Sequence, residues 1–410
     1  MLIMKVIDGG ITAAIGFEAA GVEAGVKYAN RKDMAIIYSQ KECVAAATFT
    51  SNVVKAAPVV WDKKLVEESD YVQAVIVNTG VANAGTGSEG MRICEESAQA
   101  AADALKLKKE NILIGSTGVI GAQIPLDKIK GGIEKLVAAK AHTKEAGTDA
   151  SKAIMTTDTV NKEFAVQVEI GGKTVTLGAM CKGSGMIHPN MCTMLSYVAT
   201  DAVIGKETLT KLVKESIVDT YNMVSVDGDT STNDSYIVMA NGMAGNEEIV
   251  EGTEAYEEFK KALFFVNETQ AKRLAGDGEG ATALVECYVC NMDTKQNARI
   301  LAKSVICSSL TKAAVFGHDA NWGRILCALG YSGVQFDPEN MEIYLAAGNN
   351  KILIYKDGMD AGYSEEEATK ILSEKEVQII ADMKMGKEEA KAWGCDLTFD
   401  YVKINADYRS

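Results

Sequence analysis

A threonine at the start of an apolar run could act as a nucleophile in this chain. Residues 181–202 read CKGSGMIHPNMCTMLSYVATDA, where glycines and a proline predict an irregular loop and the run from Thr193 predicts a strand. A cut between Cys192 and Thr193 would give Thr193 an α-amine with a pKa of about 8, which could take the proton of its own hydroxyl. Spacing alone favours the plainer interpretation, in which Thr193 is a β-branched residue that begins a strand.

Histidine and cysteine chemistry is weakly indicated. Of the three histidines, His142 lies in a polar helix end, whereas His188 and His318 lie in Gly-rich loops that could serve a site. Histidines in such loops more often bond to backbone. The pair Cys287-x-x-Cys290 lies in a strand-like run that would point the two thiols to opposite faces. We therefore expect neither a zinc nor a redox site, and any acyl-transfer chemistry would need a base other than histidine.

A nucleotide site is also disfavoured. Residues 85–90, GTGSEG, match the dinucleotide pattern formally, but seven residues separate them from Val77 at the end of the expected strand. The chain contains no P-loop pattern. The acidic residues Asp227, Asp229 and Asp234 do not have the EF-hand spacing and predict turns and hydrogen bonds. We expect no metal and no bound cofactor.

Composition and charge exclude several other classes of function. The chain has 410 residues, of which 47% are hydrophobic and 24% charged, as in an ordinary globular protein. Its net charge of -14 disfavours nucleic acid and anionic membranes as partners. Its nine cysteines are scattered, so we expect reduced thiols. Because no apolar stretch approaches the length of a membrane span, we expect a cytoplasmic protein.

The elements that must position these residues alternate between strands and helices, which predicts a layered α/β protein. The clearest hairpin joins two alternating runs through Gly171 and Gly172. The polar, Gly-rich residues 275–282 are the best candidate for a domain boundary. Strands are expected at 34–39, 73–80, 111–118, 163–170, 173–180 and 298–305, and helices at about 89–106, 127–141, 206–222, 254–274 and 364–386.

Motifs spread over the whole chain resemble those of one family. In order along the chain they read GSTGVIG (115–121), MTTDTVNKE (155–163), the 181–202 segment, SVDGDTSTNDS (225–235), GDGEGAT (276–282), GHDANWGRI (317–325) and NADYRS (405–410). Together they resemble the arginine-biosynthetic ornithine acetyltransferase family, whose members are often also glutamate N-acetyltransferases. Seven separated motifs in order are very improbable by chance.

The resemblance implies a fold and a processing event. The fold would be an αββα-like sandwich, of the type shared with the DmpA aminopeptidase, over residues 1–280, followed by a smaller C-terminal α/β domain over 281–410. The precursor would cut itself between Cys192 and Thr193, where relatives usually carry alanine at the position of Cys192. The resulting α chain (1–192) and β chain (193–410) would stay associated as a heterodimer, paired as an α2β2 heterotetramer.

The resemblance also implies a reaction. Thr193 would take the acetyl group of N2-acetylornithine and pass it to glutamate, while Thr117 and Gly118 would form the oxyanion hole. Acetyl-CoA is a further candidate donor in a bifunctional member. The nearest rival is an aminopeptidase or amidohydrolase with the same self-cut nucleophile. The substrate shell would comprise Thr159, Lys182, Thr193, Glu279, Asn405 and Ser410.

Overall fold

The computed structural model describes residues 4–188 and 194–406. Its described residues form two compact units. The N-terminal unit falls within Met1–Gly183, Asn190–Val218 and Thr230–Gln270, and the C-terminal unit within Ser184–Pro189, Asp219–Asp229 and Ala271–Ser410. In this part of the chain the two compact units divide between residues 270 and 271. The domain boundary predicted between residues 280 and 281 stays a prediction.

The strands of the N-terminal unit form one hydrogen-bonded path. They are β1 (Met4–Ile7), β2 (Phe17–Val22), β3 (Met34–Phe49), β4 (Val72–Asn78), β5 (Ile112–Ser116), β6 (Lys162–Ile170), β7 (Lys173–Lys182), β8 (Leu195–Thr200) and β10 (Ser235–Ala240). Their order is β1-β6-β7-β8-β10-β3-β4-β5, with β2 also paired to β3. The first half of β3 pairs with β2 and β4 and its second half with β10, with an irregularity between Tyr38 and Cys43. The long strand β3 therefore joins two parts of the path.

These two parts pack face to face through a shared apolar core. Ile37 and Val75 from the β3–β4 part lie in one buried cluster with Tyr197 and Ile237 from the β8–β10 part. Such a cluster is the expected result when alternate residues of two strand layers turn toward each other. The core of this unit therefore lies between two strand layers.

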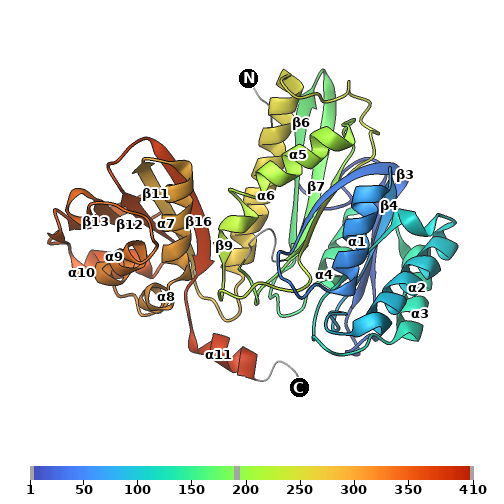
Figure 1. The fold of residues 1–410 in the computed structure, drawn as a ribbon, viewed down its shortest axis with the longest axis horizontal. Coiled ribbons are helices and arrows are strands. Elements are labelled where there is room, and N and C mark those ends of the chain that lie inside the picture. The colour runs from blue at the N-terminus through green and yellow to red at the C-terminus, as the bar shows by residue number, and fades with distance from the viewer. Residues whose placement is uncertain (1–3, 189–193, 407–410) are drawn as a thin grey trace. The chain divides into compact units, whose positions relative to one another are not determined.

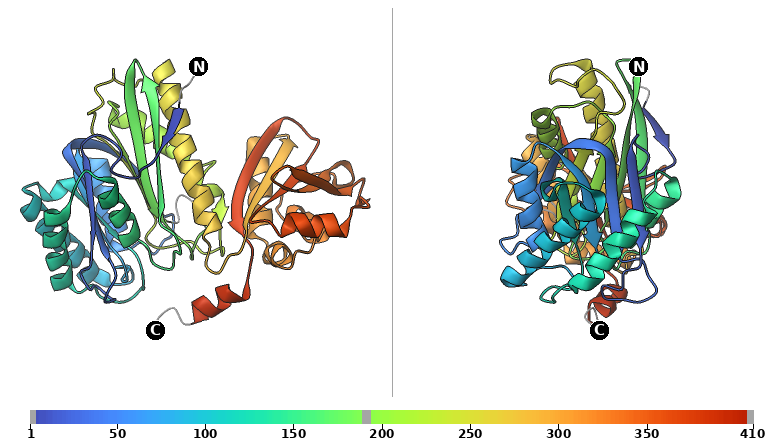
Figure 2. Two further views of the ribbon diagram at one scale, coloured as in Figure 1. Left: turned by 180° about the vertical axis from the view of Figure 1, so that it is seen from behind. Right: turned by 90° about the vertical axis from the view of Figure 1, so that its right-hand side faces the viewer.

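Helices cover the two outer faces. The helices of this unit are α1 (Ala57–Glu68), α2 (Gly87–Leu105), α3 (Leu126–Ala139), α4 (Lys144–Ala153), α5 (Lys206–Ser216) and the first part of α6 (Glu254–Gly276). Ile93 of α2 and Ile129 of α3 pack on Ile76 of β4 in a second cluster. On the other side α5 packs on β3, and Phe265 of α6 contacts Phe164 of β6 at 5.6 Å between ring centres. Figures 1 and 2 show helices on both sides of these strands, which confirms the predicted αββα-like sandwich.

The hairpin predicted at Gly171 and Gly172 is present. Strands β6 and β7 pair antiparallel from Lys162 with Cys181 to Ile170 with Lys173. The two glycines have φ angles of 57° and 73°, a left-handed conformation that glycine adopts without steric cost. The hairpin fixes the register of β7, and with it the position of Lys182 at the end of that strand.

The C-terminal unit has its own sheet. The strand order is β14 (Met359–Asp360), β13 (Asn350–Lys356), β12 (Glu342–Ala347), β15 (Glu376–Asp382), β11 (Leu284–Met292), β16 (Glu388–Cys395) and β9 (Val224–Ser225). Its helices are α7 (Lys295–Cys307), α8 (Ser309–Phe316), α9 (Trp322–Gly330), α10 (Glu365–Leu372) and α11 (Phe399–Ala406). Helix α7 packs on β11 and β16, and α10 on β12 and β13. Short 3-10 helices lie at Lys109–Asn111, Tyr221–Met223 and Pro338–Asn340.

Three predicted elements differ from the structure. The strand expected at 298–305 is wrong, because these residues lie inside α7 and bury Leu301, Ala302 and Val305 at helical spacing. The helix expected at 364–386 begins as predicted, with Ser364 accepting a bond from the Glu367 amide, but it ends at Leu372 and residues 376–382 form β15. The helix expected at 206–222 ends at Ser216.

In residues 4–188 and 194–406 no helix combines the length and the apolar character that crossing a membrane requires.

We predict opposite effects from removing two buried tyrosine hydroxyls. The Tyr236 hydroxyl donates to Asn267 Oδ1 at 2.9 Å, whereas the Tyr197 hydroxyl has no hydrogen-bond partner within the described ranges. An unpaired buried hydroxyl costs free energy, so Tyr197→Phe should keep or raise the midpoint of thermal unfolding, and Tyr236→Phe should lower the free energy of unfolding by about 1–2 kcal/mol. Equal losses in the two variants, measured by calorimetry, would contradict the prediction.

Candidate active site

The residues predicted to form an oxyanion hole lie at the carboxyl ends of two parallel strands. Thr117 and Gly118 directly follow β5, which pairs with β4 up to Asn78 and Ser116. The Thr117 amide donates to the Asn78 carbonyl at 3.1 Å. Gly118 has a φ of 129°, and a Cβ added there would lie 2.3 Å from the carbonyl carbon of Gly80. Glycine is therefore required where the loop touches the neighbouring backbone.

Buried polar side chains form hydrogen bonds that fix this loop. Asn233 Nδ2 donates to the Ser116 carbonyl at 2.8 Å and to the Ala82 carbonyl at 2.5 Å. Ser116 Oγ in turn donates to Asn78 Oδ1 at 2.6 Å. Because Asn233 fastens the carbonyl immediately before Thr117, it acts as a positioning residue for the loop.

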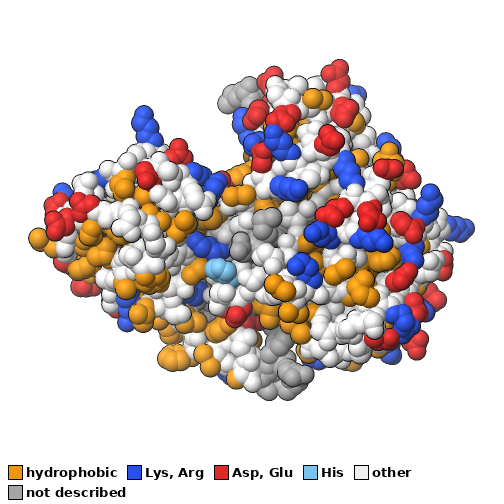
Figure 3. Space-filling model, viewed as in Figure 1, with side chains coloured by type: hydrophobic (Ala, Val, Ile, Leu, Met, Phe, Trp, Pro, Cys, Tyr) orange, Lys and Arg blue, Asp and Glu red, His pale blue; other side chains and the backbone are white. Residues whose placement is uncertain are grey.

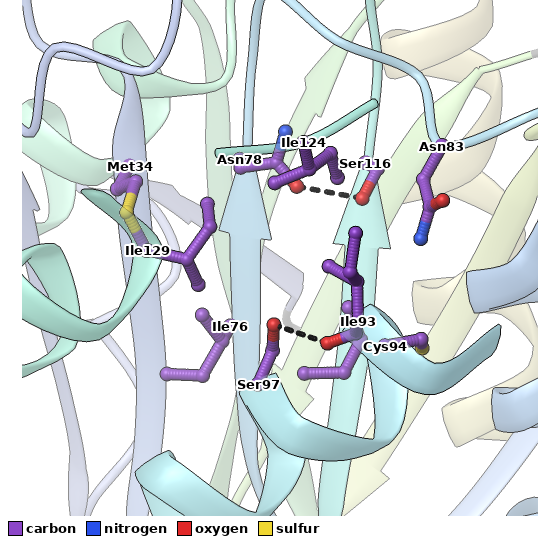
Figure 4. Close-up of a pocket in the computed structure, with 11 residues that line it drawn as sticks. Met34, Ile76, Asn78, Asn83, Ile93, Cys94, Ser97, Ser116, Ile124 and Ile129 are labelled. Atoms are coloured by element: carbon purple, nitrogen blue, oxygen red, sulfur yellow. Dashed lines mark hydrogen bonds between the residues drawn. The ribbon is translucent and has the colours of Figure 1, made fainter. Parts of the chain in front are cut away.

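A small cavity lies under the same strand ends. It measures about 10 Å³ and has Asn78, Asn83, Ser97 and Ser116 among its lining residues. Figure 4 shows Asn78 and Ser116 pointing toward each other, with the Ser97 hydroxyl bonded to the Ile93 carbonyl. A volume near 10 Å³ holds about one water molecule, so the cavity belongs to the support of the loop and is too small for a substrate.

Lys182 brings a positive charge to the Thr117 side chain. It is the last residue of β7, only 8% exposed, and its ammonium donates to Thr117 Oγ1 at 3.4 Å. Lys182 pairs across the sheet with Leu195 at the start of β8. The predicted nucleophile Thr193 precedes Leu195 by two positions in the sequence and, like Cys192, lies outside the described residues.

A buried carboxylate beside Thr159 stabilises this lysine. Asp158 accepts from Lys162 Nζ and from the Gly183 amide, both at 2.7 Å. Burial alone would raise the pKa of Asp158, but the ammonium groups of Lys182 and Lys162 outweigh it and lower the pKa to about 2. Asp158 is therefore ionised at neutral pH. Thr159 itself is exposed, on the loop between α4 and β6.

The charge of Lys182 also acts on a second buried acid, Asp234, but there burial outweighs it. Burial raises the pKa of Asp234 well above its ordinary value, and a hydrogen bond from Ser231 and the charge of Lys182 offset only part of this effect. Its Oδ2 atom has no hydrogen-bond partner in the described part of the chain. Lys182 thus lowers the pKa of two buried carboxyl groups, and burial is outweighed only at Asp158.

The C-terminal unit brings together two other predicted site residues. Glu279 is buried, and its carboxylate accepts from Asn405 Nδ2 of α11 at 2.6 Å. The Glu279 amide donates to the Ser184 carbonyl at 3.0 Å, and a Cβ on Gly185 would lie 2.3 Å from the Glu279 carboxyl carbon. The loop of 184–188 therefore packs tightly on Glu279. Ser410 lies outside the described residues.

The structure thus joins Thr117, Gly118 and Lys182 in one unit and Glu279 and Asn405 in the other. Sequence reasoning missed Asp158 and Asn233, although both lie inside the motifs MTTDTVNKE and SVDGDTSTNDS. The prediction that Asp227 makes hydrogen bonds is confirmed, because it accepts from the amides of Met186 and Ile187 at 2.6 and 2.9 Å. Among residues 4–188 and 194–406, no group of three or more His, Cys, Asp or Glu side chains is arranged to hold a metal ion.

The fold and the strand-end residues define a class of protein. It is an αββα sandwich in which a Thr-Gly loop after β5 lies beside a buried lysine at the end of β7. The model of the ArgJ family matches residues 18–410. The chain belongs to this family.

Individual members of the family are similar in sequence to this chain over nearly its full length. The arginine biosynthesis bifunctional protein ArgJ of Caldanaerobacter subterraneus subsp. tengcongensis is 49% identical over 407 residues, which cover 99% of this chain and all of that protein. The protein named ArgJ 1 of Clostridium acetobutylicum is 50% identical over 400 residues, 98% of this chain and 97% of that protein. A crystal structure of ArgJ from Bacillus halodurans is 44% identical with a TM-score of 0.50, and covers 52% of this chain and 98% of its own.

We predict that Asp158→Asn destabilises the protein mainly above pH 4. The folded-state pKa of about 2 lies below the ordinary value of about 3.9, so the carboxylate stabilises the fold above pH 4 and this contribution is lost as the pH falls toward 2. At pH 7 the variant also removes the negative charge that is paired with the buried Lys162 ammonium, which should cost about 3–5 kcal/mol.

Urea unfolding at pH 7 and pH 3 measures this difference. The loss of unfolding free energy should be smaller at pH 3, and Asp70→Asn, at an exposed carboxylate, should change stability little at either pH. A loss of equal size at both pH values would contradict the assignment of an ionised Asp158.

Proposed function

We propose that the chain is a self-processing N-acetyltransferase of arginine biosynthesis, which moves the acetyl group of N2-acetylornithine to glutamate. The observation that carries the proposal is the end-to-end likeness to curated proteins named arginine biosynthesis bifunctional protein, at 49% identity over 407 residues. The juxtaposition of Thr117, Gly118 and Lys182 supports it, because acyl transfer needs donors for a developing oxyanion.

In the proposed reaction Thr193 attacks the acetyl carbonyl carbon. Its hydroxyl proton passes to its own α-amine, and the tetrahedral intermediate expels ornithine as the C–N bond breaks and the leaving nitrogen takes up a proton. The acetyl group then remains as an ester on the Thr193 oxygen. The amine of glutamate attacks this ester, N-acetylglutamate leaves, and the hydroxyl is restored.

Thr117 and Gly118 would stabilise the oxyanion in both halves of the reaction. Thr117 Oγ1 accepts a hydrogen bond from Lys182, so its own hydroxyl proton can be donated to the substrate oxygen, beside the Gly118 amide. The buried ammonium of Lys182 adds a positive charge where negative charge develops, and it can also attract the carboxylate that both amino-acid substrates carry. Asp158 would keep this lysine in place.

Thr159, Glu279, Asn405 and Ser410 would contact the amino-acid substrates, and the α and β chains would form an α2β2 assembly in the cytoplasm. A chain cut before Thr193 would have a β chain slightly longer than half of the 410 residues. The matched chain of the Bacillus halodurans structure is also about half as long as this one, since 98% of it covers 52% of this chain, which supports the cut. Acetyl-CoA would serve as the second acetyl donor.

We predict that the purified protein consists of two chains, the second beginning Thr-Met-Leu-Ser. The measurement is the intact mass under denaturing conditions, followed by N-terminal sequencing. Thr193→Ala should remain a single chain of 43.7 kDa, because the nucleophile of the cut is removed, while Cys192→Ala should be processed like the wild type. A wild-type chain that stays whole and is still active would refute the α-amine mechanism.

We further predict that turnover of N2-acetylornithine depends on glutamate. In a transferase the acetyl-threonine ester is shielded from water and waits for the acceptor amine. Release of ornithine should therefore stop after about one equivalent without glutamate, and continue with matching formation of N-acetylglutamate when it is added. Equal steady rates with and without glutamate would identify the chain as a hydrolase of the same fold instead.

A further inference from the structure

A lysine in the loop between β2 and β3 of the N-terminal unit has its charged end buried. Lys27 as a whole is partly exposed, but its Nζ atom is buried and has no hydrogen-bond partner in residues 4–188 and 194–406. Lysines usually bury the stem and keep the ammonium in water. On the face shown in Figure 3, lysine and arginine side chains project from the surface over the helices of this unit. A buried ammonium without a partner costs free energy, so packing alone does not explain Lys27.

The acids of the same loop are bonded to backbone amides instead of this lysine. Asp33 accepts from two amides of the loop at 2.7 and 2.6 Å, and Glu23 accepts from a third at 2.7 Å. The Lys27 ammonium lies against the Tyr28 ring, with 4.8 Å between Nζ and the ring centre. A cation–π contact replaces only part of the hydration that a buried ammonium loses. The positive charge is therefore available to an anionic ligand.

The loop that carries this lysine lies at the same sheet edge as the oxyanion loop. Val22, at the end of β2, pairs with Met34 at the start of β3, and Met34 pairs with Asn78 at the end of β4. Asn78 in turn pairs with Ser116, which directly precedes Thr117. The pairing therefore brings both loops to one edge.

Lys27 and Gly118 both pack on Gly80. Gly80 has a φ of 95°, and a Cβ added there would lie 2.7 Å from the Lys27 Cβ. The Gly80 carbonyl accepts from the Val119 amide at 3.1 Å, and a Cβ on Gly118 would lie 2.3 Å from the Gly80 carbonyl carbon. One glycine thus lies in contact with the lysine and with the oxyanion loop.

The same loop also reaches a second segment that the proposed function assigns to the substrate. Arg31 donates to the Met155 carbonyl at 2.6 Å, on the segment between α4 and β6. Arg31 and Thr159 border one open pocket. The β2–β3 loop therefore contacts both the oxyanion loop and the segment that carries Thr159.

The two amino acids of the proposed reaction differ in the charge of their side chains. The buried Lys182 already supplies a cation for the α-carboxylate that both carry. Glutamate has a second carboxylate on its side chain, whereas ornithine has an ammonium there. A buried positive charge is weakly screened, so it attracts the first and repels the second.

We infer that Lys27 is a specificity-determining residue that binds the side-chain carboxylate of the glutamate acceptor. The inference rests on the proposed function, because it concerns the second half of that reaction. Tyr28, whose ring lies against the ammonium, is 39% exposed. Exposed side chains change rotamer within nanoseconds, so turning of this ring admits the carboxylate. The same charge repels the ornithine ammonium, and the acetyl group passes on to glutamate instead of returning to ornithine.

The test removes the charge and keeps the length of the side chain. Lys27→Met should raise the KM for glutamate roughly ten- to hundredfold, as expected when a hydrogen bond to a charged group is lost. The KM for N2-acetylornithine should not rise, because that substrate has no side-chain carboxylate. Glutamine serves as an uncharged acceptor, and the ratio of kcat/KM for glutamate to that for glutamine should fall by the same factor. Lys27→Arg, which keeps the charge, should retain most of this preference.

Thermal unfolding separates this role from a structural one. Because Lys27→Met removes a buried charge that has no hydrogen-bond partner, the midpoint of unfolding should stay the same or rise. The control is Lys64→Met, the same substitution at an exposed residue of α1. It should leave both KM values and the acceptor preference as in the wild type.

Two outcomes would overturn the inference and leave the proposed function in place. The first is an unchanged KM for glutamate in Lys27→Met. The second is an equal rise in the KM of both substrates, with or without a lower midpoint, which would assign Lys27 to support of the loop. If the wild type transfers no acetyl group from N2-acetylornithine to glutamate, the proposed function itself fails, and the inference fails with it.

Discussion

The buried ion cluster around Asp158 is the interaction on which the rest of the site depends. Its carboxylate is fully buried, and it is bonded to the Lys162 ammonium and to the backbone amide of Gly183. A buried charge is tolerated only when it is paired and hydrogen-bonded, so these partners are held together as a unit. The cluster thereby ties the loop before β6 to the end of β7, where Lys182 reaches Thr117. Lys182 keeps its position beside Thr117 because moving the end of β7 would break the bond between the Gly183 amide and the buried Asp158 carboxylate.

The two buried acids near Lys182 have pKa values that are shifted in opposite directions. Lys182 and Lys162 lower the pKa of Asp158, while burial raises that of Asp234. Lys182 acts on both acids in the same direction, but burial is outweighed only at Asp158, where Lys162 adds a second charge and a hydrogen bond. The difference between the two acids therefore comes from the additional partners of Asp158.

Local patterns were predictable from the sequence, and contacts between distant segments were not. The hairpin at Gly171 and Gly172 follows from alternation and turn chemistry within twenty residues, and the αββα fold followed from the resemblance. The strand expected at 298–305 failed because its apolar residues also satisfy helical spacing, and the helix expected at 364–386 failed because its second half carries no glycine or proline near Leu372 to mark the end. Asn233 was missed because its partner Ser116 is 117 residues away.

A chain with a large negative net charge has to place positive charges locally if it is to bind an anion. With a net charge of -14 the chain repels anions at long range, and at physiological salt this repulsion fades beyond about 8 Å. Binding then depends on cations within reach of the ligand. A buried ammonium such as that of Lys182 is weakly screened and suits a single carboxylate held in fixed geometry.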